Sequence, residues 1–297
     1  MAFRVIIKFF LTLQLSALIL LATGCGLTSN QIVKTQSFGA ATTKIGKLGE
    51  SEFENIRIRI IEMNTEFVAI DKTRISSDLN INKPISPEAT AVRVAATKAL
   101  KSYGELLIEL TSDYKKENLQ RTANSLMNNV NVALGFNFTQ KDKESIKKVI
   151  VGFGSFWVRK KKADAVKQIV TAYENSVNQL ADLLIEDFSL EGTAGYIKMY
   201  DSTARRLRDI SIYIINRGEE YSAFERYRAV EALVMSEEAI SRAVKISKMA
   251  RNAIEGLKKA NSELVKIMKK ESYSTGDIEV YAKQTQELIN IFQVFTN

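Results

Sequence analysis

The chain offers few residues that could carry out catalysis. Its 297 residues include no histidine and a single cysteine. Serine and cysteine triads need an imidazole, and so do the common zinc and di-iron sites, so these chemistries are excluded. One thiol cannot form an internal disulfide, a CxxC pair or a Cys-rich metal cluster.

Carboxylates are the remaining candidates, because paired Asp and Glu side chains can hydrolyse glycosidic bonds without histidine. Adjacent acids occur at residues 186–187, 219–220 and 237–238. Adjacent residues of a helix point about 100° apart and do not converge on one substrate. The sequence also lacks a phosphate loop, a dinucleotide fingerprint and an EF-hand. We therefore expect no enzyme, no cofactor and no metal, and a carboxylate hydrolase is only a third hypothesis.

The single thiol, Cys25, lies at the end of a leader-like segment. Residues 1–8 carry two cations, and residues 9–22 are almost wholly apolar. At 1.5 Å per residue this run would span about 21 Å, which is short of the ~30 Å hydrocarbon core of a bilayer. A basic start, an apolar centre and a small-residue exit predict a secretory signal peptide over residues 1–24.

The residues Ala22, Thr23, Gly24 and Cys25 resemble the lipobox of bacterial lipoproteins. The resemblance covers about the first 26 residues. It implies a diacylglyceryl group on Cys25, cleavage between Gly24 and Cys25, and acylation of the new amino terminus. Two or three acyl chains anchor a protein stably. Gly26 stands where an aspartate commonly retains lipoproteins in the inner membrane, which implies the outer membrane if the source has two. The alternatives are an ordinary cleaved signal peptide and an uncleaved amino-terminal anchor.

A second unusual segment combines glycine, aromatic residues and flanking cations. Residues 149–158 are apolar and contain the only tryptophan. A ten-residue helix spans about 15 Å, too short to cross a bilayer. It is interpreted as a buried helix of the bundle, an element at the lipid interface, or a docking surface for another protein. The residues that could contact membrane or partner are Gly152, Phe153, Gly154, Phe156, Trp157, Arg159, Lys160, Lys161 and Lys162.

The elements that must position these residues are helices. Apolar residues recur at alternating spacings of three and four over residues 53–70, 92–110, 166–184, 240–268 and 278–295. This period is typical of amphipathic helices that pack on one another. We therefore predict an all-α, elongated antiparallel bundle over residues 50–297. Residues 25–49, rich in Thr, Ser, Gly and Ala, are predicted to be a lipidated Cys followed by a flexible tether.

Capping and turn residues occur where the predicted helices would begin and end. Ser86 is a predicted N-cap with proline after it, and residues 274–277 predict a capping box. Loops are expected at 136–140 and 189–195. Residues 219–271 contain no proline, and they predict one helix roughly 80 Å long. Asn261 lies in its apolar stripe, either as a polar position that fixes register or facing water at the end of the bundle.

These features lead to two main hypotheses of function. The first is a lipid-anchored, non-enzymatic helical protein of the bacterial envelope that acts as a scaffold or an adaptor for another envelope protein. The alternative is a membrane-active protein of the helical pore-forming type that uses residues 149–158. The net charge of +8 is a small excess for this length, and an exported protein is removed from cytoplasmic nucleic acid, so nucleic-acid binding is not expected.

Overall fold

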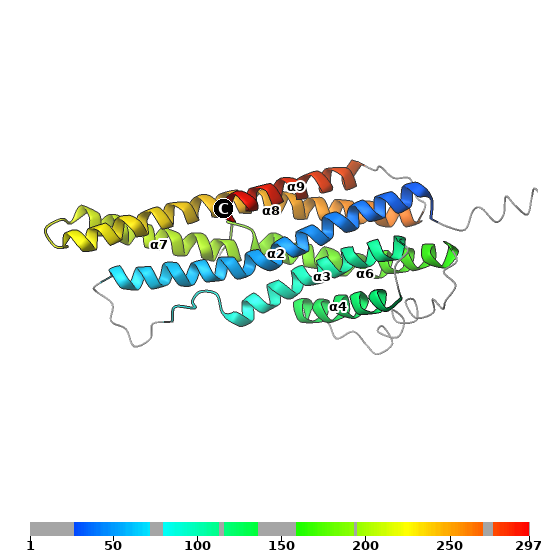
Figure 1. Ribbon diagram of the computed structural model, residues 1–297, viewed down its shortest axis with the longest axis horizontal. Helices are drawn as coiled ribbons and strands as arrows, with labels where there is room; N and C mark the ends of the chain where they lie inside the picture. The colour runs from blue at the N-terminus through cyan, green and yellow to red at the C-terminus, as the bar shows by residue number, and fades with distance from the viewer. Residues whose placement is uncertain are drawn as a thin grey trace, which may run out of the picture.

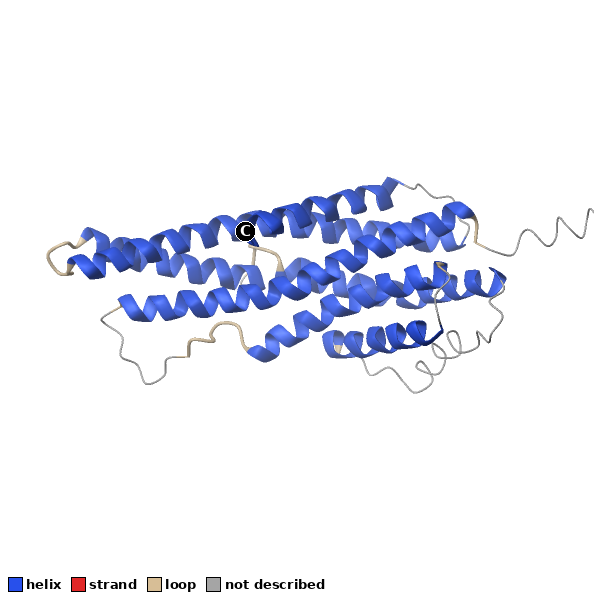
Figure 2. Ribbon diagram, in the orientation of Figure 1, coloured by secondary structure: helices blue, strands red, loops and turns tan. Residues whose placement is uncertain are grey.

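The computed structural model describes residues 27–71, 80–112, 116–135, 159–192, 195–269 and 276–296. Within these ranges the chain forms helices and no strands, which confirms the predicted all-α bundle (Figure 1, Figure 2). The helices are α2 (Ser29–Ile70), α3 (Pro87–Thr111), α4 (Lys116–Leu134), α6 (Arg159–Asp187), α7 (Tyr196–Asn216), α8 (Ala223–Lys269) and α9 (Gly276–Thr296).

Two helices set the length of the bundle. α2 has 42 residues and α8 has 47, so they extend about 63 and 70 Å at 1.5 Å per residue. The long helix predicted over 219–271 is therefore confirmed for 223–269. α6 and α7 follow one another along α8, while α3, α4 and α9 flank the half of the bundle in which α2 begins (Figure 1). Successive helices joined by a reversal, such as α2 and α3 or α7 and α8, are antiparallel.

The predicted apolar stripes form the core. Phe53, Ile60 and Tyr173 are fully buried, as are most other members of the five stripes. Aromatic rings connect different helices: Phe38 of α2 meets Tyr103 of α3 edge-on at 6.2 Å and Tyr281 of α9 at 5.6 Å. Because each helix buries one face against two or more others, the helices stabilise one another as a single core.

Helix ends follow the residue types expected for them. The Ser86 hydroxyl accepts a hydrogen bond from the Ala89 backbone N–H at 3.1 Å, with proline in the first turn. A loop interrupts the chain between α6 and α7 as predicted, and Gly192 in it has a φ of 85°, a conformation that favours glycine. α9 begins at Gly276, whereas the other predicted loop, 136–140, and residues 274–275 lie outside the described residues.

The prediction of a flexible tether is wrong for residues 29–49. These residues form the first half of α2, and Phe38 and Ile45 within them are buried in the core. Thr28 begins the helix with a capping box, in which its hydroxyl and the Gln31 side chain exchange hydrogen bonds with each other's backbone N–H. The helical body therefore starts at residue 29 and not at residue 50.

The small residues that suggested a tether are instead a helix contact. Gly39 and Gly46 of α2 lie against the backbone of α3. A Cβ at Gly46 would stand 2.5 Å from the Lys101 backbone nitrogen and 2.6 Å from the Thr97 carbonyl oxygen. Glycine is needed here because the two helices approach too closely for any side chain.

Asn261 takes the first of its two predicted roles and does not face water. Its side chain is fully buried in α8. Its amide oxygen accepts a hydrogen bond from the Tyr103 hydroxyl at 3.3 Å, and its amide nitrogen donates to the Glu174 carbonyl oxygen at 3.5 Å. A buried amide with partners on α3 and α6 favours one register of α8 against both helices.

Candidate functional site

Most of the residues predicted to meet membrane or partner lie outside the described residues. Gly24 and Cys25 do so, as do Gly152, Phe153, Gly154, Phe156 and Trp157. The cations that follow them, Arg159, Lys160 and Lys161, form the first turn of α6. Lys162 comes next, and its ammonium donates a hydrogen bond to the Ser112 carbonyl oxygen at the end of α3, at 2.9 Å.

One of the adjacent acid pairs contributes a buried ion pair that joins two helices. Asp187, at the end of α6, is 2% exposed and accepts hydrogen bonds from the Arg93 guanidinium of α3 at 3.1 to 3.2 Å. Burial raises the pKa of Asp187, although the guanidinium acts in the opposite direction. The geometry assigns this carboxylate to helix packing, because its oxygens are directed at Arg93.

A second buried ion pair, not foreseen from the sequence, joins α2 to α8. The Arg242 Nη2 atom donates to both carboxylate oxygens of Glu52, at 2.9 and 2.8 Å. The two side chains are 11% and 1% exposed. Burial raises the pKa of Glu52, and this effect is larger than the lowering caused by Arg242.

A cavity of about 110 Å³ lies beside the Glu52–Arg242 pair. Its lining is Arg59, Met63, Tyr200, Met235, Glu238, Ala239 and Arg242.

Because the pKa of Glu52 is raised, the contribution of this group to the stability of the fold should fall as the pH rises. The folded protein keeps the proton of Glu52 to a higher pH than the unfolded chain, whose carboxyl titrates near 4.5. The stability contributed by this group is thus present below pH 4.5 and is lost as the pH rises through the raised pKa. We expect the free energy of unfolding, taken relative to Glu52→Gln, to be lower at about pH 7 than at about pH 4. Urea unfolding of both chains at the two pH values measures this, and a difference that grows with pH would contradict it.

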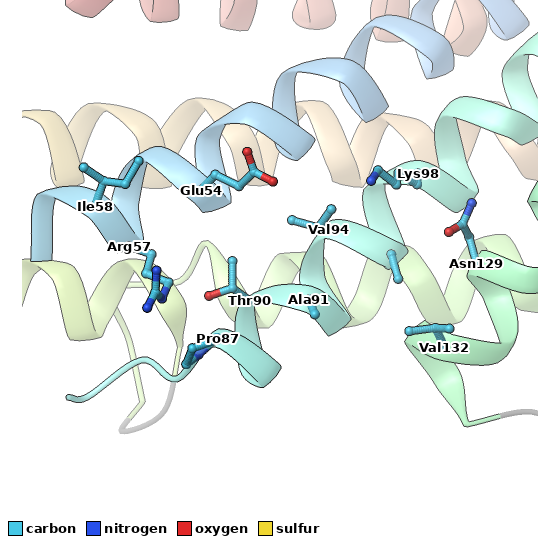
Figure 3. Close-up of a pocket in the computed structure, with 11 residues that line it drawn as sticks. Glu54, Arg57, Ile58, Pro87, Thr90, Ala91, Val94, Lys98, Asn129 and Val132 are labelled. Atoms are coloured by element: carbon cyan, nitrogen blue, oxygen red, sulfur yellow. The ribbon is translucent and has the colours of Figure 1, made fainter. Parts of the chain in front are cut away.

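A solvent-open groove lies between α2, α3 and α4. Its volume is about 560 Å³. Figure 3 shows Glu54, Arg57 and Ile58 of α2 on one wall, and Val132 on α4 at the far side. The Arg57 guanidinium is held by the Asn82 side-chain oxygen at 2.6 Å. The groove combines charges of both signs with an apolar floor from α3, and no nucleophile and base converge in it.

The most distinctive exposed feature is a row of apolar side chains at the start of α8. Phe224, Tyr227, Val230 and Val234 are 70%, 60%, 46% and 54% exposed. In a helix these four residues fall within a sector of roughly 120° on one face. We refer to them as the hairpin face, because they lie where α7 and α8 form a hairpin. Large apolar residues in a continuous exposed row mark interaction surfaces.

The hairpin that carries this face is well braced. The Ser222 hydroxyl and Glu225 carboxylate exchange hydrogen bonds with each other's backbone N–H at the start of α8. Across the turn, Arg217 pairs with Glu220 at 3.0 Å. Arg228 also pairs with Glu66 at the end of α2, at 2.7 Å. These contacts hold the start of α8, and with it the hairpin face, in a fixed position on the bundle.

Two further properties bear on location and chemistry. Over the ranges that the structure describes, no helix is both long and apolar enough to span a bilayer. In the same ranges no three acidic or thiol side chains come together in a way that could hold a metal ion.

Comparison with known proteins gives no match: no protein family, no curated protein and no solved structure is detectably similar to this chain.

Sequence reasoning missed the hairpin face and the Glu52–Arg242 pair for different reasons. Phe224, Tyr227, Val230 and Val234 have a helical spacing that is visible in the sequence. The same spacing is found in apolar residues that are buried in a core, so it does not show that these four are exposed. Only the packing shows which face of α8 its neighbours leave uncovered. Glu52 and Arg242 are 190 residues apart, and no local pattern relates them.

Proposed function

We propose that this protein is a lipid-anchored, non-enzymatic adaptor of the bacterial cell envelope, held to the membrane through acyl chains on Cys25. If the envelope has two membranes, Gly26 favours the outer one. The lipobox-like residues 22–25 support the anchor. The long, braced bundle supports a role in holding another protein at a distance from the chain's amino-terminal end.

The observation that carries the adaptor role is the hairpin face. It lies at the end of the bundle opposite the start of α2, the helix that follows Cys25 in the sequence (Figure 1). Its residues keep the three- and four-residue spacing by which the helices of this bundle pack on one another. The partner that fits is therefore an envelope protein with an apolar helix of its own.

Site-specific photocrosslinking tests this role. A photoreactive phenylalanine analogue at Tyr227 is expected to give one discrete adduct in intact cells. The same analogue at Glu255, an exposed position farther along α8, serves as the matched control. If the hairpin face is buried against an apolar helix, each aspartate of the double variant Val230→Asp with Val234→Asp would lose its hydration in the contact. We therefore expect this variant to reduce the adduct at least tenfold.

Two results would oppose the proposal. Equal adducts at 227 and 255 would indicate random collision, and an adduct that survives both aspartates would show that the hairpin face is not the contact. The anchor is tested separately by the mass of the mature amino terminus. Cys25→Ser is expected to move the protein from the membrane fraction to the soluble fraction.

A further inference from the structure

Carboxylates lie on the hairpin face, among its apolar residues and directly beyond them. At about 100° per residue along α8, Glu231 and Glu238 fall within the same sector as the four apolar residues, and Glu237 lies about 20° outside it. All three side chains are exposed. Glu231 lies next to Tyr227, because a hydrogen bond between the Tyr227 hydroxyl and the Glu231 carboxylate raises the pKa of this tyrosine. The carboxylates therefore belong to the same surface as the apolar row.

The cations of α8 that could neutralise two of these carboxylates are committed to other partners. Side chains three or four positions apart are neighbours on a helix. Arg228 is the cation at this distance from Glu231, and it pairs with Glu66 of α2 at 2.7 Å. Arg242 is the cation at this distance from Glu238, and it forms the buried ion pair with α2 described above. Both arginines therefore serve the contact between α2 and α8.

The third carboxylate, Glu237, has no cation of α8 three or four residues away. On the neighbouring helix α7, the pKa of Arg205 is raised mainly by Asp201, to which its guanidinium donates a hydrogen bond at 2.8 Å, and less by Glu237. In the part of the chain that the structure describes, none of Glu231, Glu237 and Glu238 forms an ion pair. The hairpin face therefore carries three negative charges that the chain itself leaves unpaired.

We infer that the partner of the hairpin face is a basic amphipathic helix, with an apolar row that packs on the four apolar side chains and with cations that meet Glu231 and Glu238. The inference rests on the proposed function, because it names the chemistry of the partner at that same surface. Glu231 and Glu238 are seven residues apart, so they are separated by about 10 Å along α8. Lysine or arginine residues seven positions apart in the partner helix match this spacing.

Charge complementarity selects this partner over a helix that is only apolar. A neutral or acidic helix on the apolar row would partly desolvate the carboxylates and give them no counter-charge, which is costly. Lysine or arginine on the partner replaces the lost hydration with ion pairs and also speeds the encounter. The same carboxylates disfavour a second copy of this chain, because two hairpin faces in contact would bring like charges together.

Two labelled peptides test the charge selection. Both form the same amphipathic helix, with leucines at spacings of three and four. One peptide carries lysines seven positions apart beside the leucine row, and the other carries glutamates at the same positions. Fluorescence anisotropy measures their binding to the full chain. We expect the lysine peptide to bind at least tenfold more tightly in low salt, and we expect this preference to shrink in high salt, because salt screens exposed charges.

Removing the carboxylates tests whether they cause the preference. Glu231→Gln with Glu238→Gln keeps the size of both side chains and leaves the apolar row in place. We expect this variant to bind the lysine peptide at least fivefold more weakly and to bind the two peptides about equally. The control, Glu255→Gln with Glu287→Gln, removes two charges at exposed positions outside the hairpin and should leave the preference unchanged.

The outcomes distinguish this inference from the proposed function. Equal binding of both peptides, abolished by Val230→Asp with Val234→Asp, would keep the hairpin face as a helix-binding surface and overturn its charge selection. Binding of neither peptide also overturns the inference, while the photocrosslink at Tyr227 in cells still tests the adaptor role by itself. A dimer of the full chain in sedimentation experiments, dissociated by the two aspartates, would show that a second copy occupies the face and would overturn the basic partner.

Discussion

Replacing Arg242 with methionine is expected to lower the free energy of unfolding by about 3–5 kcal/mol. The reason is the environment of its partner: Glu52 is 1% exposed and receives hydrogen bonds from Arg242 at 2.9 and 2.8 Å. Methionine keeps much of the volume of the arginine stem but leaves the carboxylate buried without its counter-charge. The folded variant must then bury an unpaired charge or take up a proton, and both are costly.

The double variant Arg242→Met with Glu52→Met separates the cost of an orphaned charge from the value of the pair. Removing both charges from a buried pair is often neutral or stabilising, so most of the lost stability should return. Lys283→Met provides the surface control. Its partner Glu287 is 3.8 Å away and both side chains are well exposed, so the loss should stay below about 1 kcal/mol. Urea unfolding followed by circular dichroism measures all four chains; a double variant no more stable than Arg242→Met would disprove the explanation.

Gly104→Ala is expected to cost about 1–3 kcal/mol, although alanine is the better helix former. Gly104 of α3 packs against α2, and a Cβ there would clash with the Gly39 carbonyl oxygen and would lie 2.7 Å from the Thr43 backbone nitrogen. Backbone atoms of a packed helix cannot move aside as a side chain can. The two helices must therefore separate, and the buried contacts on either side of Gly104 loosen.

Gly256→Ala is the matched control, since it makes the same substitution inside another long helix. The atom nearest to a Cβ added at Gly256 is the Gln284 amide oxygen, which lies at the end of a side chain that can rotate away. We expect a change between zero and a gain of about 1 kcal/mol, because alanine limits the unfolded chain and favours the helix. Thermal unfolding of both variants measures the contrast. Equal effects at the two sites would show that close approach of α2 and α3 is not what requires Gly104.

The sequence allowed the helical class to be predicted because burial imposes a period on each helix. Val166, Val170 and Tyr173 recur at that period and are all buried, and Ser86 is an N-cap as its neighbours suggested. The period reports the apolar side of a helix whatever its partner is. It could not show where that side is left uncovered, as at Phe224 and Tyr227.

The start of the bundle was predicted incorrectly because glycine has two opposite uses. Gly39 and Gly46 occur among Thr, Ser and Ala, a composition typical of flexible connections. The same small residues permit close contact between helices, and which use applies depends on residues of α3 that lie more than fifty positions later in the chain. The Glu52–Arg242 pair has the same character, since only the folded bundle brings its two members together.

The arrangement of α6 and α7 along one unbroken α8 has a consequence for how the molecule unfolds. α6 ends at Asp187 and α7 begins at Tyr196, so this break divides the helices that pack along α8 into two halves of the bundle. Both halves rest on the same 47-residue helix, and α2 packs beside α7, α8 and α9. Neither half can melt without exposing part of a helix that the other half needs, so heat or denaturant should remove the whole bundle in one cooperative transition.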